Sequence, residues 1–201
     1  MEGRMRESSL ERGFQYDGAG GGRTPQRQRF AEQVGLLVKA LRSTEDGVQE
    51  LAVVQITLLG PKAVPYLTSA LEDALDESDL GQSAHRHVPG TERAIAGICV
   101  ALGIIRDADA VVDLAVALPR REAVEALSKI GGDRALNLLM ETIEWWCSPP
   151  SGVADADPAF VRAVFLRFGE AGARRLREEL EDESPSRRAA VAEIIRIVGD
   201  P

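Results

Sequence analysis

The sequence has few aromatic residues, few cysteines and no long apolar run. Aromatic residues make up only 4% of its 201 residues, whereas apolar residues of all kinds make up 44%. Because β-sandwiches depend on aromatic and β-branched strands, this balance favours close-packed helices built from alanine, leucine, valine and isoleucine. The length is enough for one sizeable domain or a small repeat array.

The two cysteines, Cys99 and Cys147, are too few to predict a disulfide framework. Cys99 lies in the longest apolar run, AIAGICVALGII at residues 94–105, and is predicted to be a small core residue. That run is too short to cross a bilayer and predicts a buried helix. The N-terminus shows no apolar signal core, so we expect a reducing, cytoplasmic setting and no membrane partner.

Positive charge is scarce beyond the first thirty residues. The net charge is −8, and residues 1–30 carry six arginines against four acids. Residues 31–80 carry three basic residues against nine acidic ones, and the two remaining segments, 81–150 and 151–201, each have a net charge of −2. Because nucleic-acid binding needs a basic face, this distribution disfavours a polynucleotide partner.

Recognisable catalytic motifs are also missing. The sequence has no nucleophile elbow, no phosphate-binding loop and no zinc-hydrolase pair. The stretch GAGGG at residues 18–22 lacks the preceding strand and following helix that a dinucleotide site needs. We therefore expect a protein that is not an enzyme and that carries no cofactor.

Residues 1–29 are rich in glycine, arginine and glutamine without any period, which predicts a disordered, flexible N-terminal tail. A short docking peptide is the alternative interpretation of this tail. From Phe30 onward the chain is predicted to be helical throughout, so the expected boundaries are a tail at 1–29 and a repeat domain at 30–201.

Five breaks divide the helical region, at Gly60, Arg106, Gly131, Gly169 and Gly199. Positions 8, 5, 4 and 1 before each break share one helix face, and nineteen of these twenty residues are apolar, with Gln55 the exception. Each of the first four breaks is followed by two apolar residues four apart, namely Leu67 and Leu71, Leu114 and Leu118, Leu139 and Ile143, and Leu176 and Leu180. A single helix pair cannot bury its apolar face alone, so the pattern predicts an all-α array of about five antiparallel helix pairs.

Three stretches, VEALSKIGGDRALNLLMETI, LLGPKAVPYLTSALED and DESPSRRAAVAEIIRIVGDP, resemble HEAT repeats. More narrowly, they are similar to the short HEAT-like repeats of phycobilisome lyases. The resemblance implies an α-solenoid, or superhelix, of the armadillo type that serves as a protein-binding scaffold. Some members of this group are bilin lyases, others are accessory subunits, and some relatives bind DNA as glycosylases.

These observations leave three functional hypotheses. The first is a non-catalytic scaffold or adaptor that binds another protein through its helix surface and one edge. The alternative is a bilin lyase or chromophore chaperone. A glycosylase-like DNA-binding protein is the third, and the acidic charge argues against it.

Two long loops are predicted between helices, at residues 78–90 and 148–158, and equivalent loops of a repeat array emerge along one edge. A tight turn at Pro119 and Arg120 lies between them, so the loops should flank a notch. The alternative is that both loops are insertions without a role. The candidate protein-binding residues on this edge are His85, Arg86, His87, Arg120, Arg121 and Trp145.

The pair His85 and His87 lacks the further ligands that a zinc site needs, so no metal site is expected. Arginines crowd the last helix pair, where neighbouring acids predict local ion pairs and a phosphate-binding cluster is the alternative. The last helix has either an unusually polar outer face or a cover provided by a partner or a second copy. The second case would give a homo-oligomer through the C-terminal helix.

Overall fold

A computed structural model gives the structure of the chain, and it describes residues 24–45, 47–84, 89–143 and 157–199. Within these ranges every regular element is an α-helix or a 3-10 helix, and no strand occurs there. The predicted all-α fold is therefore confirmed.

The helices follow one another with short connections. Their bounds are α1 Thr24–Ala40, α2 Val48–Leu59, η1 Gly60–Ala63, α3 Val64–Ala84, α4 Thr91–Ile105, η2 Ala108–Ala110, α5 Val111–Val116, α6 Arg121–Ile130, α7 Gly132–Glu141, α9 Pro158–Leu166, α10 Gly169–Glu179 and α11 Pro185–Val198.

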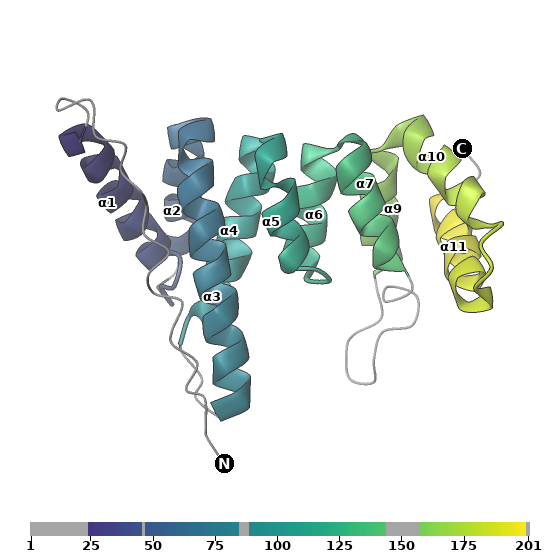
Figure 1. Cartoon of the computed structure of the whole chain (residues 1–201), viewed down its shortest axis with the longest axis horizontal. Helices are drawn as coiled ribbons and strands as arrows, with labels where there is room; N and C mark the ends of the chain where they lie inside the picture. Colours follow the sequence, from purple (N-terminus) through teal and green to yellow (C-terminus); the bar gives the residue numbers. More distant parts are fainter. Residues whose placement is uncertain (1–23, 46, 85–88, 144–156, 200–201) are drawn as a thin grey trace, which may run out of the picture.

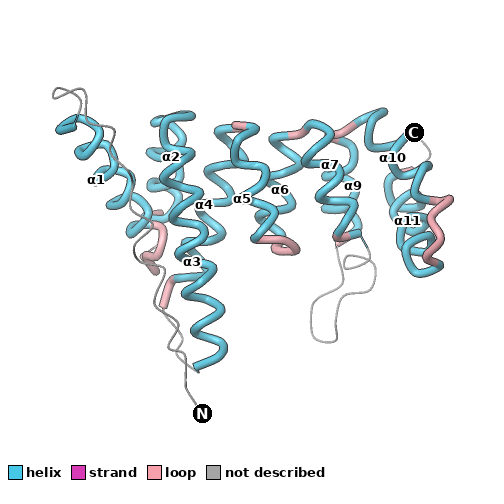
Figure 2. The backbone as a smooth tube through the Cα atoms, in the orientation of Figure 1, coloured by secondary structure: helices cyan, strands magenta, loops and turns pink. Residues whose placement is uncertain are grey.

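These helices lie side by side in a row (Figure 1). One layer contains α2, α4, α6, α9 and α11, each packed against the next. The other layer contains α3, α5 and α7, with α1 against both α2 and α3 at one end of the row and α10 against α9 and α11 at the other. The backbone runs back and forth between two edges as it passes along the row (Figure 2).

Four predicted breaks, Gly60, Arg106, Gly131 and Gly199, lie directly after a helix, whereas Gly169 begins α10 after α9 has ended at Leu166. Gly131 closes α6 with φ 76°, and its amide donates to the Leu127 carbonyl. Arg106 closes α4 in the left-handed helical conformation with φ 58°, although it is not a glycine, and its amide donates to the Leu102 carbonyl. Left-handed backbone after a helix satisfies the last carbonyl groups and turns the chain towards the second layer.

The residues at positions 8, 5, 4 and 1 before each break, called here the break-anchored rows, form part of the core. All nineteen apolar members are buried or half-buried, whereas Gln55, the one polar member, is exposed. The apolar pairs that follow the first three breaks lie in the second layer. Their first members, Leu67, Leu114 and Leu139, are at most 1% exposed. Leu180 differs from its counterparts because 39% of it is exposed.

Two predicted boundaries differ from the structure. Residues 24–29 belong to α1, so the helical domain begins inside the predicted tail of residues 1–29. The first predicted loop, residues 78–90, begins too early, because α3 continues to Ala84. Its continuation has a physical reason: no proline interrupts it before Pro89, and the buried Ser78 hydroxyl donates to Glu92 of α4 at 2.7 Å.

One described stretch, Val48–Asp79, is long and apolar enough to cross a membrane by length and composition alone. It consists of α2, η1 and α3 in succession, and Ala52, Ile56 and Leu67 within it are buried in the core. Some of its apolar residues are therefore core residues, and others, Leu51, Val54 and Leu58 of α2, are exposed.

Candidate functional site

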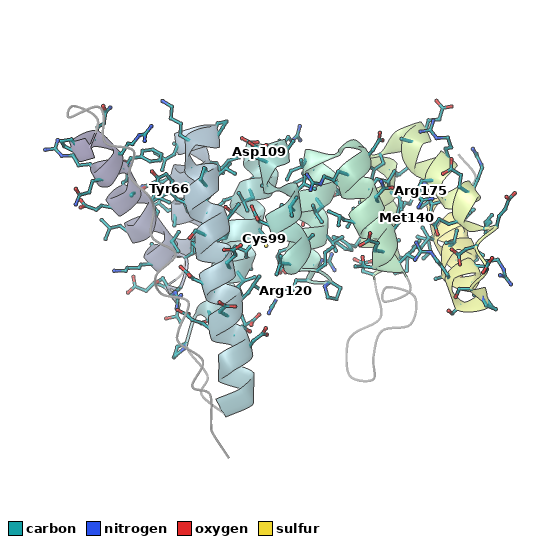
Figure 3. All side chains as sticks on the ribbon, viewed as in Figure 1. Tyr66, Cys99, Asp109, Arg120, Met140 and Arg175 are labelled. Atoms are coloured by element: carbon teal, nitrogen blue, oxygen red, sulfur yellow. The ribbon has the colours of Figure 1, made fainter. Side chains whose placement is uncertain are left out.

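The predicted edge is partly described. The C-terminal ends of α3 and α7, from which the two predicted loops continue, lie at the same edge of the row (Figure 1). Arg120, in the turn between α5 and α6, lies at that edge as well (Figure 3). The structure therefore brings the described parts of the predicted edge together.

Arg120 is held by its own chain. Its guanidinium forms an ion pair with Glu92 at the start of α4, and its second terminal nitrogen lies 3.5 Å from the Ser78 hydroxyl. Since Ser78 also donates to Glu92, one carboxylate ties together α3, α4 and the turn before α6. These contacts give Arg120 a structural role at the edge.

A second ion pair supports the same corner of the molecule. Arg42, just after α1, lies 2.8 Å from the carboxylate of Glu77 on α3, and the Thr91 hydroxyl donates to that carboxylate at 3.3 Å. The hydrogen bond from Arg42 lowers the pKa of Glu77 below its usual value. The two charges of this corner, Arg42 and Glu77, are therefore paired within the chain.

Arg121 begins α6 and contacts α9. Its guanidinium lies 3.7 Å from Asp157, which caps α9, and 4.1 Å from the centre of the Phe160 ring. A cation over an aromatic face is attracted by the ring's quadrupole. Arg121 thus connects two neighbouring helices of one layer, although 58% of its side chain remains exposed.

The other four candidates, His85, Arg86, His87 and Trp145, lie outside the described residues. Their role at the edge stays a prediction. Within the described residues no group of three or more histidine, cysteine or acidic side chains is arranged to hold a metal ion.

Four arginines of the last helix pair, Arg174, Arg175, Arg187 and Arg196, form ion pairs, as the local-pairing interpretation predicts. Glu179 of α10, only 6% exposed, binds both Arg175 at 2.5 Å and the Nε of Arg187 on α11. Arg196 pairs with Glu193 at 2.6 Å, and Arg188 donates to the Asp182 carbonyl. These contacts join α10 to α11 and supply no cluster of unpaired cations for phosphate.

An apolar groove lies between the helices of this same end. Its volume is about 280 Å³, and its lining comes from α9, α10 and α11. The lining residues are Phe165, Leu166, Gly169, Ala173, Leu176, Arg177, Leu180, Ile195, Val198 and Gly199. Arg177 is the only charged residue among them, so the groove offers an almost wholly apolar surface.

None of the candidate residues predicted from the sequence lies in this groove, although one signal for it was present. Leu166 is a leucine at a position outside the buried row of its helix, and it is 55% exposed. Leu180 belongs to a buried row by its spacing, yet it faces the groove at 39% exposure. Exposed leucines beside a groove are the mark of a surface for another apolar group.

Comparison with known protein families gives a match to part of the chain. Residues 119–144 match the model of the PBS lyase HEAT-like repeat. No curated protein matches the chain. The matched segment covers α6 and α7 with the Gly131–Gly132 turn between them, so the chain contains a HEAT-like repeat made of α6 and α7.

Proposed function

We propose that the chain is a non-catalytic α-solenoid scaffold that binds another protein. The two-layered row of helix pairs and the HEAT-like match of α6 and α7 support the solenoid. The observation that carries the binding function is the apolar groove between α9, α10 and α11. A cytoplasmic setting is part of the same proposal.

The groove fits an amphipathic helix of a partner protein. Its lining includes Leu176 of α10 and Leu180 just after α10, together with Ile195 and Val198 of α11. Helices with an apolar face bind such grooves through side chains spaced three and four residues apart. The lining is apolar and partly exposed, so covering it removes leucine surface from water.

The edge that carries Arg120 and Arg121 is the second part of the proposed surface. Its two arginines already bind acids of their own chain, so they shape the edge. Contact with a partner would then come from the four candidates outside the described residues, His85, Arg86, His87 and Trp145.

Affinity purification of the full chain from its native organism tests the proposal. Leu180→Glu places a charge in the groove, and Val116→Glu is the matched control, because Val116 is 63% exposed on α5 and outside the groove. We expect a stoichiometric protein partner that Leu180→Glu loses and Val116→Glu keeps, with direct binding of the purified partner showing the same difference. The groove would be overturned as the binding site if no partner were recovered, or if the chain with Leu180→Glu and the chain with Val116→Glu both retained the partner.

A bilin lyase or chromophore chaperone is the second candidate function, and the match to a PBS lyase HEAT-like repeat favours it. Co-expression of the full chain with a bilin tests it. Visible absorbance that stays with the purified chain would support this function, and colourless protein would contradict it.

A further inference from the structure

The outward side of α2 carries an apolar stripe. Leu51, Val54 and Leu58 are 55%, 52% and 80% exposed, and their spacing of three and four residues places them in one row along the helix. Ala52 and Ile56 of the same helix are buried on its other side. The stripe therefore adds apolar surface that the core of this chain does not use.

The stripe continues onto the neighbouring helix of the same layer. Ile104 of α4 occupies the position of Leu58, two residues before the break, and it is 49% exposed. The equivalent residue of α6 is Lys129, which pairs with Glu125 at 2.9 Å. The apolar stripe of α2 and α4 thus ends where charged side chains begin.

The charges at the two ends of α2 have opposite signs. Glu50 lies in the first turn, and Lys62 lies just beyond the C-terminal end in η1. Both are exposed, and neither has an ion pair with another residue of the described ranges. A helix that runs antiparallel to α2 and carries the same two charges would bring each lysine next to a glutamate.

We propose that this stripe is the interface with a second copy of the chain, related by a two-fold axis with the two α2 helices antiparallel. In that arrangement Leu51 meets Leu58 of the second copy, and Val54 meets Gln55. Apolar residues that recur three and four positions apart form the seam along which one helix packs on another. Isologous contacts of this kind are the commonest in soluble oligomers.

The position of Gln55 is consistent with this interface. Gln55 is the polar exception in the break-anchored rows, and it is exposed beside Val54. Near the two-fold axis the two Gln55 side chains can bond to each other through their amide groups, which fixes the register of the pair.

Sedimentation velocity of the full chain, at concentrations from about 1 to about 300 µM, tests the proposal, because a small interface gives a weak dimer. We expect a concentration-dependent dimer. Val54→Glu should weaken it about tenfold or more, because each copy then buries a charge at the centre of the seam. Its melting temperature should match that of the unaltered chain, because Val54 is half-exposed.

Charge exchange tests the orientation. Glu50→Lys alone and Lys62→Glu alone should each weaken the dimer, because like charges then meet across the axis. The double variant Glu50→Lys with Lys62→Glu should restore it, since the pairing is only reversed.

Three results would overturn the proposal. The first is a chain that stays monomeric at every concentration. The second is a dimer that Leu180→Glu abolishes and Val54→Glu leaves unchanged, which would place the interface at the C-terminal groove. The third is a double charge variant as weak as the single ones. Because Leu180→Glu tests the proposed partner groove, failure of this inference and failure of the proposed function are distinguishable.

Discussion

Gly103 of α4 packs directly on Ala126 of α6: a Cβ atom added to Gly103 would lie 2.8 Å from the Cα atom of Ala126. Both residues belong to the layer in which α4 and α6 are neighbours, and both are buried. The absence of a side chain at Gly103 therefore sets how closely these two helices approach.

Gly103→Ala should destabilise the protein by about 1–3 kcal/mol, because the backbone of α6 must shift to make room. Urea unfolding followed by circular dichroism measures the change. Gly35→Ala is the matched control: Gly35 is an exposed residue within α1, and an added Cβ meets no atom within 4 Å. The control should gain roughly 0.5–1 kcal/mol from the better helix propensity of alanine. Equal effects of the two substitutions would contradict the close approach.

Arg106→Gly should stabilise the protein by about 1 kcal/mol. The left-handed backbone conformation costs a residue with a Cβ atom about that much free energy, and glycine adopts it without this cost. Arg106 has φ 58° at the end of α4, and it forms no ion pair with the described residues. Arg106→Ala keeps the Cβ and should show no gain, so a gain from alanine would contradict the backbone explanation. Thermal unfolding of the three proteins makes the comparison.

Glu179→Gln should cost about 2 kcal/mol, because it leaves two arginines without their shared buried carboxylate. Glu178→Gln is the matched control on the same helix, since Glu178 is 55% exposed and lies 3.5 Å from Arg175. Exposed pairs contribute little, so the control should change stability by less than about 0.5 kcal/mol. If Glu179→Gln proves as mild as the control, the carboxylate does not hold α10 to α11.

The thiol of Cys99 should be unreactive in the folded protein at pH 8. Cys99 is fully buried in the middle of the row (Figure 3), and burial raises its pKa to about 12, so the reactive thiolate is scarce. Alkylation in a Cys147→Ser variant, in which Cys99 is the only cysteine, measures this. Modification should be slow in buffer and fast in urea, and rapid modification of the folded protein would contradict the burial.

Stability should fall in acid partly through Glu77. Its pKa is lowered in the folded protein by Arg42, so its contribution is complete above the unfolded pKa of about 4.3 and is lost as the pH falls through the folded value. Glu77→Gln should lower the melting temperature at pH 7 and reduce its decline between pH 5 and pH 3. An unchanged decline would show that this ion pair does not contribute.

The break-anchored rows show why much of the core could be predicted. A helix that packs on one side must repeat its apolar residues every three or four positions, so the rows ending at Ile105, Ile130 and Phe168 identify their own buried faces. The extension of α3 could not be predicted in the same way. It depends on Ser78 and Glu92, which are 14 residues apart and meet only when α3 packs on α4.

Less of the candidate site than of the fold could be predicted from the sequence. The ion pairs of Arg120 and Arg121 could not be predicted from the sequence, because their acidic partners Glu92 and Asp157 come from other helices. The groove likewise depends on three helices, and Leu180 in its lining looks like an ordinary core residue by its spacing in the sequence. Contacts between distant segments determine which charge is paired and which leucine is exposed.

The helices, their breaks and their apolar faces follow from the order of the residues, because they depend on local backbone preference and on a period of 3.6 residues. The close approach of α4 to α6, the ion pairs of the arginines, and the positions of the groove and the apolar stripe follow from the packing of the helices. Burial and charge pairing depend on neighbours in space, and those neighbours are set by how each helix pair stacks on the next.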